Sequence, residues 1–184
     1  QDGLRHYRAS VSGPLIDDEL AGRLSVFEVS RDGDIDNRFN GERLNEQDRQ
    51  GFRGQLLWMP NERFSARLIG DYALQDESAV LAASHLSSMT RQRAAFVGYQ
   101  PLPASPFARR VEQNDGNRLQ TLQRGLTLQL DNYLDNDLTL TSLSGYRDWS
   151  YDSRHDADSM PLSVARSAVQ LDHHQFSQEL RLAQ

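Results

Sequence analysis

The feature that most constrains this chain is a period-two alternation of apolar and charged residues, interrupted by turns. It is clearest over 51–59 and 64–72, which a turn at 60–63 separates. Such alternation predicts β-strands that have one apolar and one polar face and pair as antiparallel hairpins. The side chains predicted to share the apolar, outward face are Phe52, Leu56, Trp58, Leu68, Tyr72, Leu24 and Val26. Those predicted to share the opposite, concave face are Arg53, Gln55, Arg67, Asp71 and Arg23.

Similar hairpins recur along the chain, and the connections between strands alternate in length. The short connections lie at 13–18, 60–63 and 133–137. The long, polar connections lie near 31–50, 75–120 and 150–173. A barrel threaded through an outer membrane has tight turns on the periplasmic side and long loops outside. We therefore predict an all-β fold: about seven antiparallel up-and-down strands, the last beginning near His174, that form a segment of a larger transmembrane β-barrel.

Composition excludes several classes of protein. No run of about 18 apolar residues occurs, which excludes a helical membrane protein. The low mean hydropathy of −0.68 still suits a barrel wall, because each strand shows lipid only every second residue. Cysteine is absent, and the net charge of −6 argues against a nucleic-acid partner. The best helix candidate, 79–93, lies inside a long connection.

The aromatic residues Trp58 and Phe64 flank the predicted turn at Pro60. Aromatic side chains form girdles where a barrel wall meets the membrane interfaces. The same spacing suits core residues beside a hairpin. The sequence leaves both interpretations open.

Three aspartates, Asp32, Asp34 and Asp36, have the spacing that can begin a calcium loop. An EF-hand loop would require glycine and glutamate where this chain has Asn37 and Arg43. We therefore expect a solvated loop here.

A second acidic group contains histidine. His155, Asp156 and Asp158 lie in the third long connection, with His173 and His174 at its far end. Such clusters can bind metals, but adjacent residues on a strand point to opposite faces. We expect an ordinary polar loop, and we predict neither a bound metal nor another cofactor.

Several stretches of the chain are similar to the barrel of one known family. They are 22–25 (GRLS) with 31–37 (RDGDIDN), 44–60 with its strand and proline turn, 140–147 (LTSLSGYR) and 176–182 (FSQELRL). In this order they resemble strands and loop starts of TonB-dependent outer-membrane receptors. The resemblance implies a barrel of about 22 strands. It also implies a plug domain that fills the barrel and a TonB box that couples it to inner-membrane energy.

Such receptors import iron–siderophore complexes, cobalamin, haem or oligosaccharides. The resemblance therefore implies that residues 1–184 are part of the barrel domain of a receptor in the bacterial outer membrane. Its partners would be outer-membrane lipid, a ligand such as a ferric siderophore and, in the full-length protein, the plug and TonB. No plug sequence, TonB box, signal peptide or terminal strand ending in an aromatic residue is found in the chain. We expect the chain to form about a third of the wall and not to transport alone.

Arginines on the predicted concave face have two interpretations. Arg23, Arg53 and Arg67 could contact an acidic ligand or the plug through paired hydrogen bonds. They could instead form a ladder with acidic residues on neighbouring strands. We favour the ladder, whose expected acidic partners are Asp71, Glu179 and Asp131.

Two other classes of protein also produce alternating strands. One is a secreted β-sandwich that binds a ligand of the carbohydrate type, and the other is a soluble β-rich enzyme. The chain contains no motif that holds a nucleophile or a phosphate, and its serine, histidine and aspartate residues are scattered over the loops. We therefore predict that it is not an enzyme.

Overall fold

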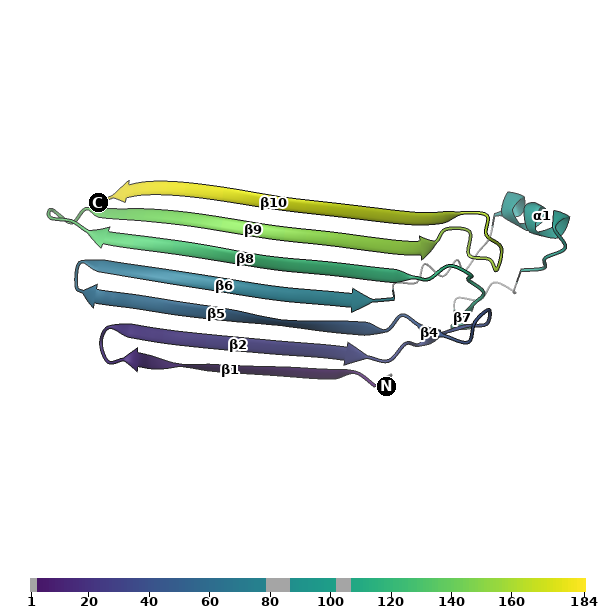
Figure 1. Ribbon diagram of the computed structural model, residues 1–184, viewed down its shortest axis with the longest axis horizontal. Helices are drawn as coiled ribbons and strands as arrows, with labels where there is room; N and C mark the ends of the chain where they lie inside the picture. Colours follow the sequence, from purple (N-terminus) through teal and green to yellow (C-terminus); the bar gives the residue numbers. More distant parts are fainter. Residues whose placement is uncertain (1–2, 79–86, 102–106) are drawn as a thin grey trace.

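The chain forms one layer of seven long, antiparallel strands in a computed structural model, which describes residues 3–78, 87–101 and 107–184 (Figure 1). The strands are β1 (Arg5–Ile16), β2 (Leu20–Arg31), β5 (Gln47–Asn61), β6 (Phe64–Glu77), β8 (Arg118–Tyr133), β9 (Thr139–Asp156) and β10 (Arg166–Ala183). Their order in the sheet follows the sequence, and β1 and β10 lie at opposite edges. The predicted up-and-down topology is confirmed, and the sheet does not close on itself.

The short and the long connections lie at opposite ends of the sheet. The turns after β1, β5 and β8 gather at the left of Figure 1, and the connections after β2, β6 and β9 gather at the right. This confirms the arrangement predicted from connection length. The first two turns are shorter than expected, because β1 continues through Pro14 to Ile16 and β5 reaches Asn61. Proline is tolerated at Pro14 because β1 is an edge strand of this sheet.

The last strand begins at Arg166, earlier than the predicted start near His174. Its first part pairs with β9 residue by residue, from Arg166 with Asp156 to His173 with Trp149. Polar residues on both faces hide the period of two there. The third long connection is therefore shorter than predicted and runs from 157 to 165.

The long connections contain structure that the sequence did not predict. A second sheet of three short strands has the order β4 (Arg43–Leu44), β3 (Ile35–Asn37), β7 (Arg110–Val111). The helix α1 (Ser88–Phe96) begins later than the predicted helix at 79–93, whose residues 79–86 lie outside the described part of the chain. Ser87 caps the helix, since its side chain accepts the Thr90 N–H. Among the described residues, no helix is long and apolar enough to cross a membrane.

The strand register separates the side chains into two faces. Directly paired residues point to the same face. Phe52 pairs with Val26 on one side and Tyr72 on the other, and Leu56 pairs with Leu68. The predicted apolar set therefore shares one face, called the apolar face below. The opposite, polar face contains the pairs Arg23–Gln55, Arg53–Asp71 and Leu57–Arg67. That the polar face is concave stays a prediction.

The apolar face is bare. Leu126 is 52% exposed and Phe176 is 68% exposed, although both lie in the middle part of long strands. Nothing in the described part of the chain forms a second layer over this face. The buried apolar side chains are instead Leu44, Ala94, Val111 and Met160, at the loop end. The long strands are thus held together by backbone pairing and not by a two-layer core.

The polar residue Gln178 interrupts the apolar face on β10, as the sequence indicated. It lies opposite Ser144 on β9, whose hydroxyl donates to the Gln178 side chain. The Gln178 amide in turn donates to the Ser142 hydroxyl at 3.0 Å. The polar interruption is therefore satisfied across the strands, which lowers the cost of placing it on this face.

Gly51 is a position where packing forbids a side chain. A Cβ atom there would lie 2.5 Å from the Tyr72 carbonyl oxygen and 2.6 Å from the Phe27 ring. Gly51→Val is expected to lower the free energy of unfolding by about 1–3 kcal/mol, because the backbone of β6 must move. Urea unfolding followed by tryptophan fluorescence measures the loss. The matched control is Gly54→Val, where no atom lies within 4 Å of the added Cβ. An equal loss in both variants would contradict this account.

Candidate functional site

The three long connections join into one structure at the loop end of the sheet. The small sheet makes the first link, because β3 belongs to the first connection and pairs in parallel with β7 of the second. The Asp36 N–H donates to the Arg109 carbonyl at 2.9 Å, and the Arg38 N–H donates to the Val111 carbonyl at 2.8 Å. Figure 1 places β4 and β7 beyond the ends of the long strands.

A buried amide pair strengthens this link. The Asn37 side chain donates to the Gln113 carbonyl at 2.8 Å and accepts the Gln113 N–H at 3.0 Å. Asn37 is 1% exposed and Gln113 is fully buried. Buried hydrogen bonds of this kind are costly to break, because each lost partner leaves a polar group without water.

The amide pair continues to Asp156, the last residue of β9, where the third connection begins. The Gln113 side-chain oxygen accepts from the Asn117 amide at 2.7 Å, and the Asn117 oxygen accepts the Asp156 N–H at 3.3 Å. The four residues form a continuous buried chain, called the loop network below: Asn37, Gln113, Asn117 and Asp156. The loop network connects all three long connections.

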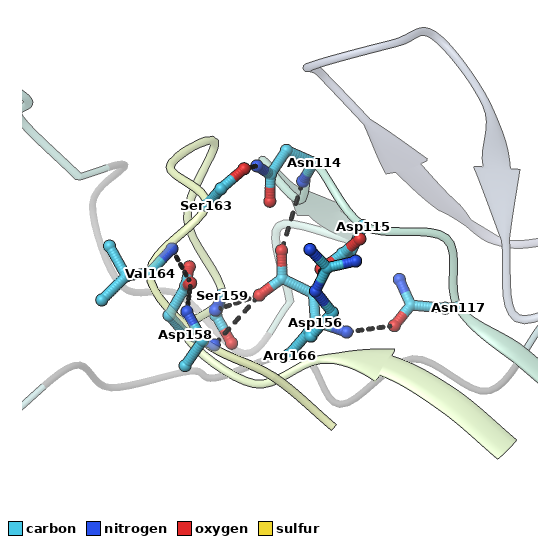
Figure 2. A network of polar contacts seen from close by, with 10 residues as sticks. Asn114, Asp115, Asn117, Asp156, Asp158, Ser159, Ser163, Val164 and Arg166 are labelled. Carbon is cyan, nitrogen blue, oxygen red and sulfur yellow. Dashed lines mark hydrogen bonds and ion pairs between the residues drawn. The ribbon is translucent and has the colours of Figure 1, made fainter. Parts of the chain in front are cut away.

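Asp156, the last residue of β9, is the member of the loop network that meets the third connection (Figure 2). Its carboxylate is 1% exposed and accepts the N–H groups of Asn114 at 3.2 Å, Asp158 at 3.0 Å and Ser159 at 2.6 Å. The neighbouring Asn114 side chain donates to the Ser163 hydroxyl at 2.8 Å. Asp156 therefore fixes the backbone of both the second and the third connection.

Tyr99 attaches α1 to the same structure. Its N–H donates to the Ala94 carbonyl at 2.9 Å, and its hydroxyl donates to Glu112, next to β7. Burial and the hydrogen bond to Glu112 raise the pKa of Tyr99 above its ordinary value. The hydroxyl thus stays protonated and holds this contact at physiological pH.

The aspartates of the first connection do not converge. The Asp34 side chain accepts from the Asn45 amide at 2.6 Å, and Asp36 lies 3.9 Å from Arg43. The described residues contain no group of three or more histidine, aspartate or glutamate side chains that could hold a metal ion. Asp34 therefore acts here as an acceptor that orders the loop backbone through Asn45.

The histidines are also apart. His155 pairs with Ser167 at the loop end, whereas His173 pairs with Trp149 and His174 pairs with Asp148 farther along the strands. The adjacent His173 and His174 point to opposite faces of β10, as expected for a strand. The carboxylate oxygens of Asp156 and Asp158 accept hydrogen bonds from backbone N–H groups and do not converge with His155.

The predicted arginine ladder is wrong in its pairing. Arg23, Arg53 and Arg67 share the polar face, but none makes a hydrogen bond or ion pair with any residue that the structure describes. Their expected partners are taken by others, since Asp71 binds Arg147, Glu179 binds Arg181, and Asp131 binds Thr141 and Gln129.

Gly125 explains why Asp71 binds Arg147 and not one of the three predicted arginines. Asp71, Gly125 and Arg147 are paired in one row across β6, β8 and β9. A Cβ atom at Gly125 would lie 2.7 Å from the Arg147 guanidinium. Because glycine has no side chain, Arg147 lies across it and reaches Asp71 at 2.5 Å.

Two aromatic pairs mark the limits of the apolar face. Phe52 and Tyr72 stack with ring centres 5.7 Å apart, and Trp58 and Phe64 meet edge to face at 5.9 Å. The two pairs are roughly 27 Å apart along β6 and roughly 20 Å apart along β5, or roughly 15–20 Å along the membrane normal at a tilt of about 40°. Both pairs therefore fit within the apolar band of about 25 Å in outer-membrane barrels. Trp58 is 43% exposed, which favours a girdle over a core position.

The comparisons with known proteins support the fold. No family model matches the chain, and no curated protein sequence matches it. It is similar to the crystal structure of the ferric yersiniabactin uptake receptor FyuA from Yersinia pestis, with a TM-score of 0.70 at 15% sequence identity. The similarity covers 97% of this chain and 25% of that chain. The chain therefore has the fold of a β-barrel wall and spans a quarter of the length of that receptor.

Proposed function

We propose that this chain is part of the barrel wall of a TonB-dependent receptor that imports a nutrient such as an iron–siderophore complex across the bacterial outer membrane. The observation that carries the proposal is the bare apolar face, bounded by aromatic pairs, on a sheet whose long connections all lie at one end. The apolar face would contact lipid, and the loop network would order the external loops. The fold similarity to FyuA supports the same conclusion.

A secreted β-sandwich remains the second candidate from the sequence. A sandwich needs a second sheet packed on the apolar face. Within residues 3–78, 87–101 and 107–184 the other sheet is the three-stranded one at the loop end. The bare face therefore favours the barrel wall.

The proposed receptor needs partners for both sheet edges. In a bilayer an open edge leaves N–H and C=O groups without hydrogen bonds, at several kcal/mol each. We propose that further strands of the full-length receptor pair with β1 and β10. A plug domain would then occupy the lumen and TonB would supply energy, so the isolated chain would not transport.

The proposal includes no catalytic activity. The carboxylates of Asp156 and Asp158, the aspartates nearest to His155 in the sequence, accept backbone N–H groups, and within the described residues neither is paired with a hydroxyl nucleophile. Hydrolysis of a generic ester, phosphate or glycoside that is lost in a His155→Ala variant would contradict this part of the proposal.

Uptake by the intact receptor tests the proposal. Cells with and without the gene are grown under iron limitation and given a panel of radiolabelled ferric siderophores. We expect the protein in the outer-membrane fraction and saturable uptake that requires both the gene and the proton-motive force. The isolated 184-residue chain in liposomes is the control and should give neither uptake nor channel openings. A protein found only in the soluble fraction would contradict the proposal.

A further inference from the structure

A hollow of about 730 Å³ lies between α1 and the third connection, at the loop end of the molecule. Small-molecule sites have volumes of about 300–1,000 Å³. Most of the side chains around it are apolar: Ala94, Phe96 and Val97 on one side, and Met160, Leu162 and Val164 on the other. Phe96 is 92% exposed, so an aromatic ring stands open at the rim.

Two charged side chains border the hollow, Asp158 and Arg93, and they differ in whether they are already hydrogen-bonded. Asp158 is committed to the backbone, since its carboxylate accepts the N–H groups of Met160 at 2.9 Å, Val164 at 3.1 Å and Ala165 at 2.7 Å. Arg93, on α1, also borders the hollow. Its guanidinium has no hydrogen bond or ion pair with the described residues. The charge available to a bound molecule is therefore positive.

Both walls of the hollow are held in place. Asp156 and Asp158 fix the backbone of the third connection through their accepted N–H groups. The Ser87 cap and the Tyr99 contact hold the two ends of α1. A site that is already ordered loses less entropy when it binds.

We propose that this hollow binds an anionic small molecule with an aromatic or apolar body. The Arg93 guanidinium would pair with the carboxylate, sulfonate or phenolate group, because its donors match two oxygen acceptors at once. The aromatic body would lie against Phe96 and between the apolar walls. This inference deepens the proposed function, on which it rests for the fate of the bound molecule, and it names the chemical class of the imported ligand.

Two naphthalene probes that differ in charge test this inference on the full-length protein in lipid nanodiscs. Naphthalene-2-sulfonate carries the anionic group, and naphthalene-2-sulfonamide is its neutral counterpart. Equilibrium dialysis, corrected with empty nanodiscs, measures the affinity of each. We expect saturable binding of the sulfonate, and about a tenfold or greater loss of its affinity in Arg93→Gln, the effect of removing a charged hydrogen bond.

Matched variants separate a specific site from a general charge effect. Arg91→Gln removes the same charge from α1, but Arg91 does not border the hollow, so its affinity should stay within about twofold of wild type. Phe96→Ala should weaken both probes, and Arg93→Gln should leave the neutral probe unchanged. No saturable binding, or equal losses in Arg91→Gln and Arg93→Gln, would overturn the inference without touching the barrel assignment. Failure of the proposed function would be seen in a different measurement, the cell fractionation, in which the protein would be absent from the outer-membrane fraction.

Discussion

Replacing Leu56 with arginine is expected to lower the free energy of unfolding in a bilayer by about 2–4 kcal/mol. Leu56 lies on the apolar face and pairs with Leu68, in a row between the two aromatic pairs. An arginine there would meet hydrocarbon near the bilayer midplane, where its charge is most costly. Urea unfolding of the full-length protein in lipid vesicles, followed by tryptophan fluorescence, gives the difference.

The control for this prediction is the neighbouring residue. Gln55 points to the polar face, beside Arg23 across the strand pair. Gln55→Arg adds the same charge on the same strand and should change stability by less than about 1 kcal/mol. If Gln55→Arg proved the more damaging variant, the assignment of the two faces to lipid and lumen would have to be reversed.

Asp156→Ala is expected to destabilise the loop end by about 2–4 kcal/mol, because buried N–H groups lose their acceptor. Asp156 accepts three of these groups and is 1% exposed. Hydrogen exchange should show faster exchange at Asn114, Asp158 and Ser159, with the central strands unchanged. Native-state exchange read by mass spectrometry locates the effect.

Asp115→Ala is the matched control for this variant. This variant removes an aspartate close to Asp156 in space. The Asp115 carboxylate lies 3.9 Å from its charged partner, the Arg166 guanidinium. Solvent-exposed ion pairs contribute about 0–1 kcal/mol, so the expected loss is small. Equal protection in Asp156→Ala and wild type would contradict the role given to the loop network.

The strands could be predicted because the polarity of each side chain matches the face of the sheet on which it lies. Apolar and charged residues such as Leu56 and Arg53 alternate with few exceptions, among them Leu57 and Ile69, since one face of each strand differs from the other over the apolar band. Beyond that band the alternation of apolar and polar residues is lost, which is why the sequence predicts a start near His174 for β10 and not at Arg166. The short strands β3 and β7 contain too few residues for any period.

The loop network could not be predicted, because its members come from distant parts of the chain. Asn37 and Gln113 meet only after β3 and β7 pair. The sequence suggests Asp156 and Asp158 as part of a possible metal cluster. An aspartate at 156 also suits a turn in which its side-chain oxygens accept the N–H groups of the residues two and three positions later, Asp158 and Ser159. That local signal describes the observed role of Asp156 better.

The Arg147 pairing shows a different limit. Its partner Asp71 lies on β6, two strands away across β8. Alternation assigns a residue to a face but gives no register between strands. The absence of a side chain at Gly125 decides which arginine reaches the carboxylate.

The loop network also constrains how specificity can change, in nature or by design. Grafting one loop from another barrel protein would remove an acceptor or donor that the other two loops require, as at Asn37 or Asp156. The three connections therefore form a single exchangeable cassette. Diversification is cheapest at exposed rim positions such as Phe96 and Val164, which can vary while the scaffold beneath them is kept.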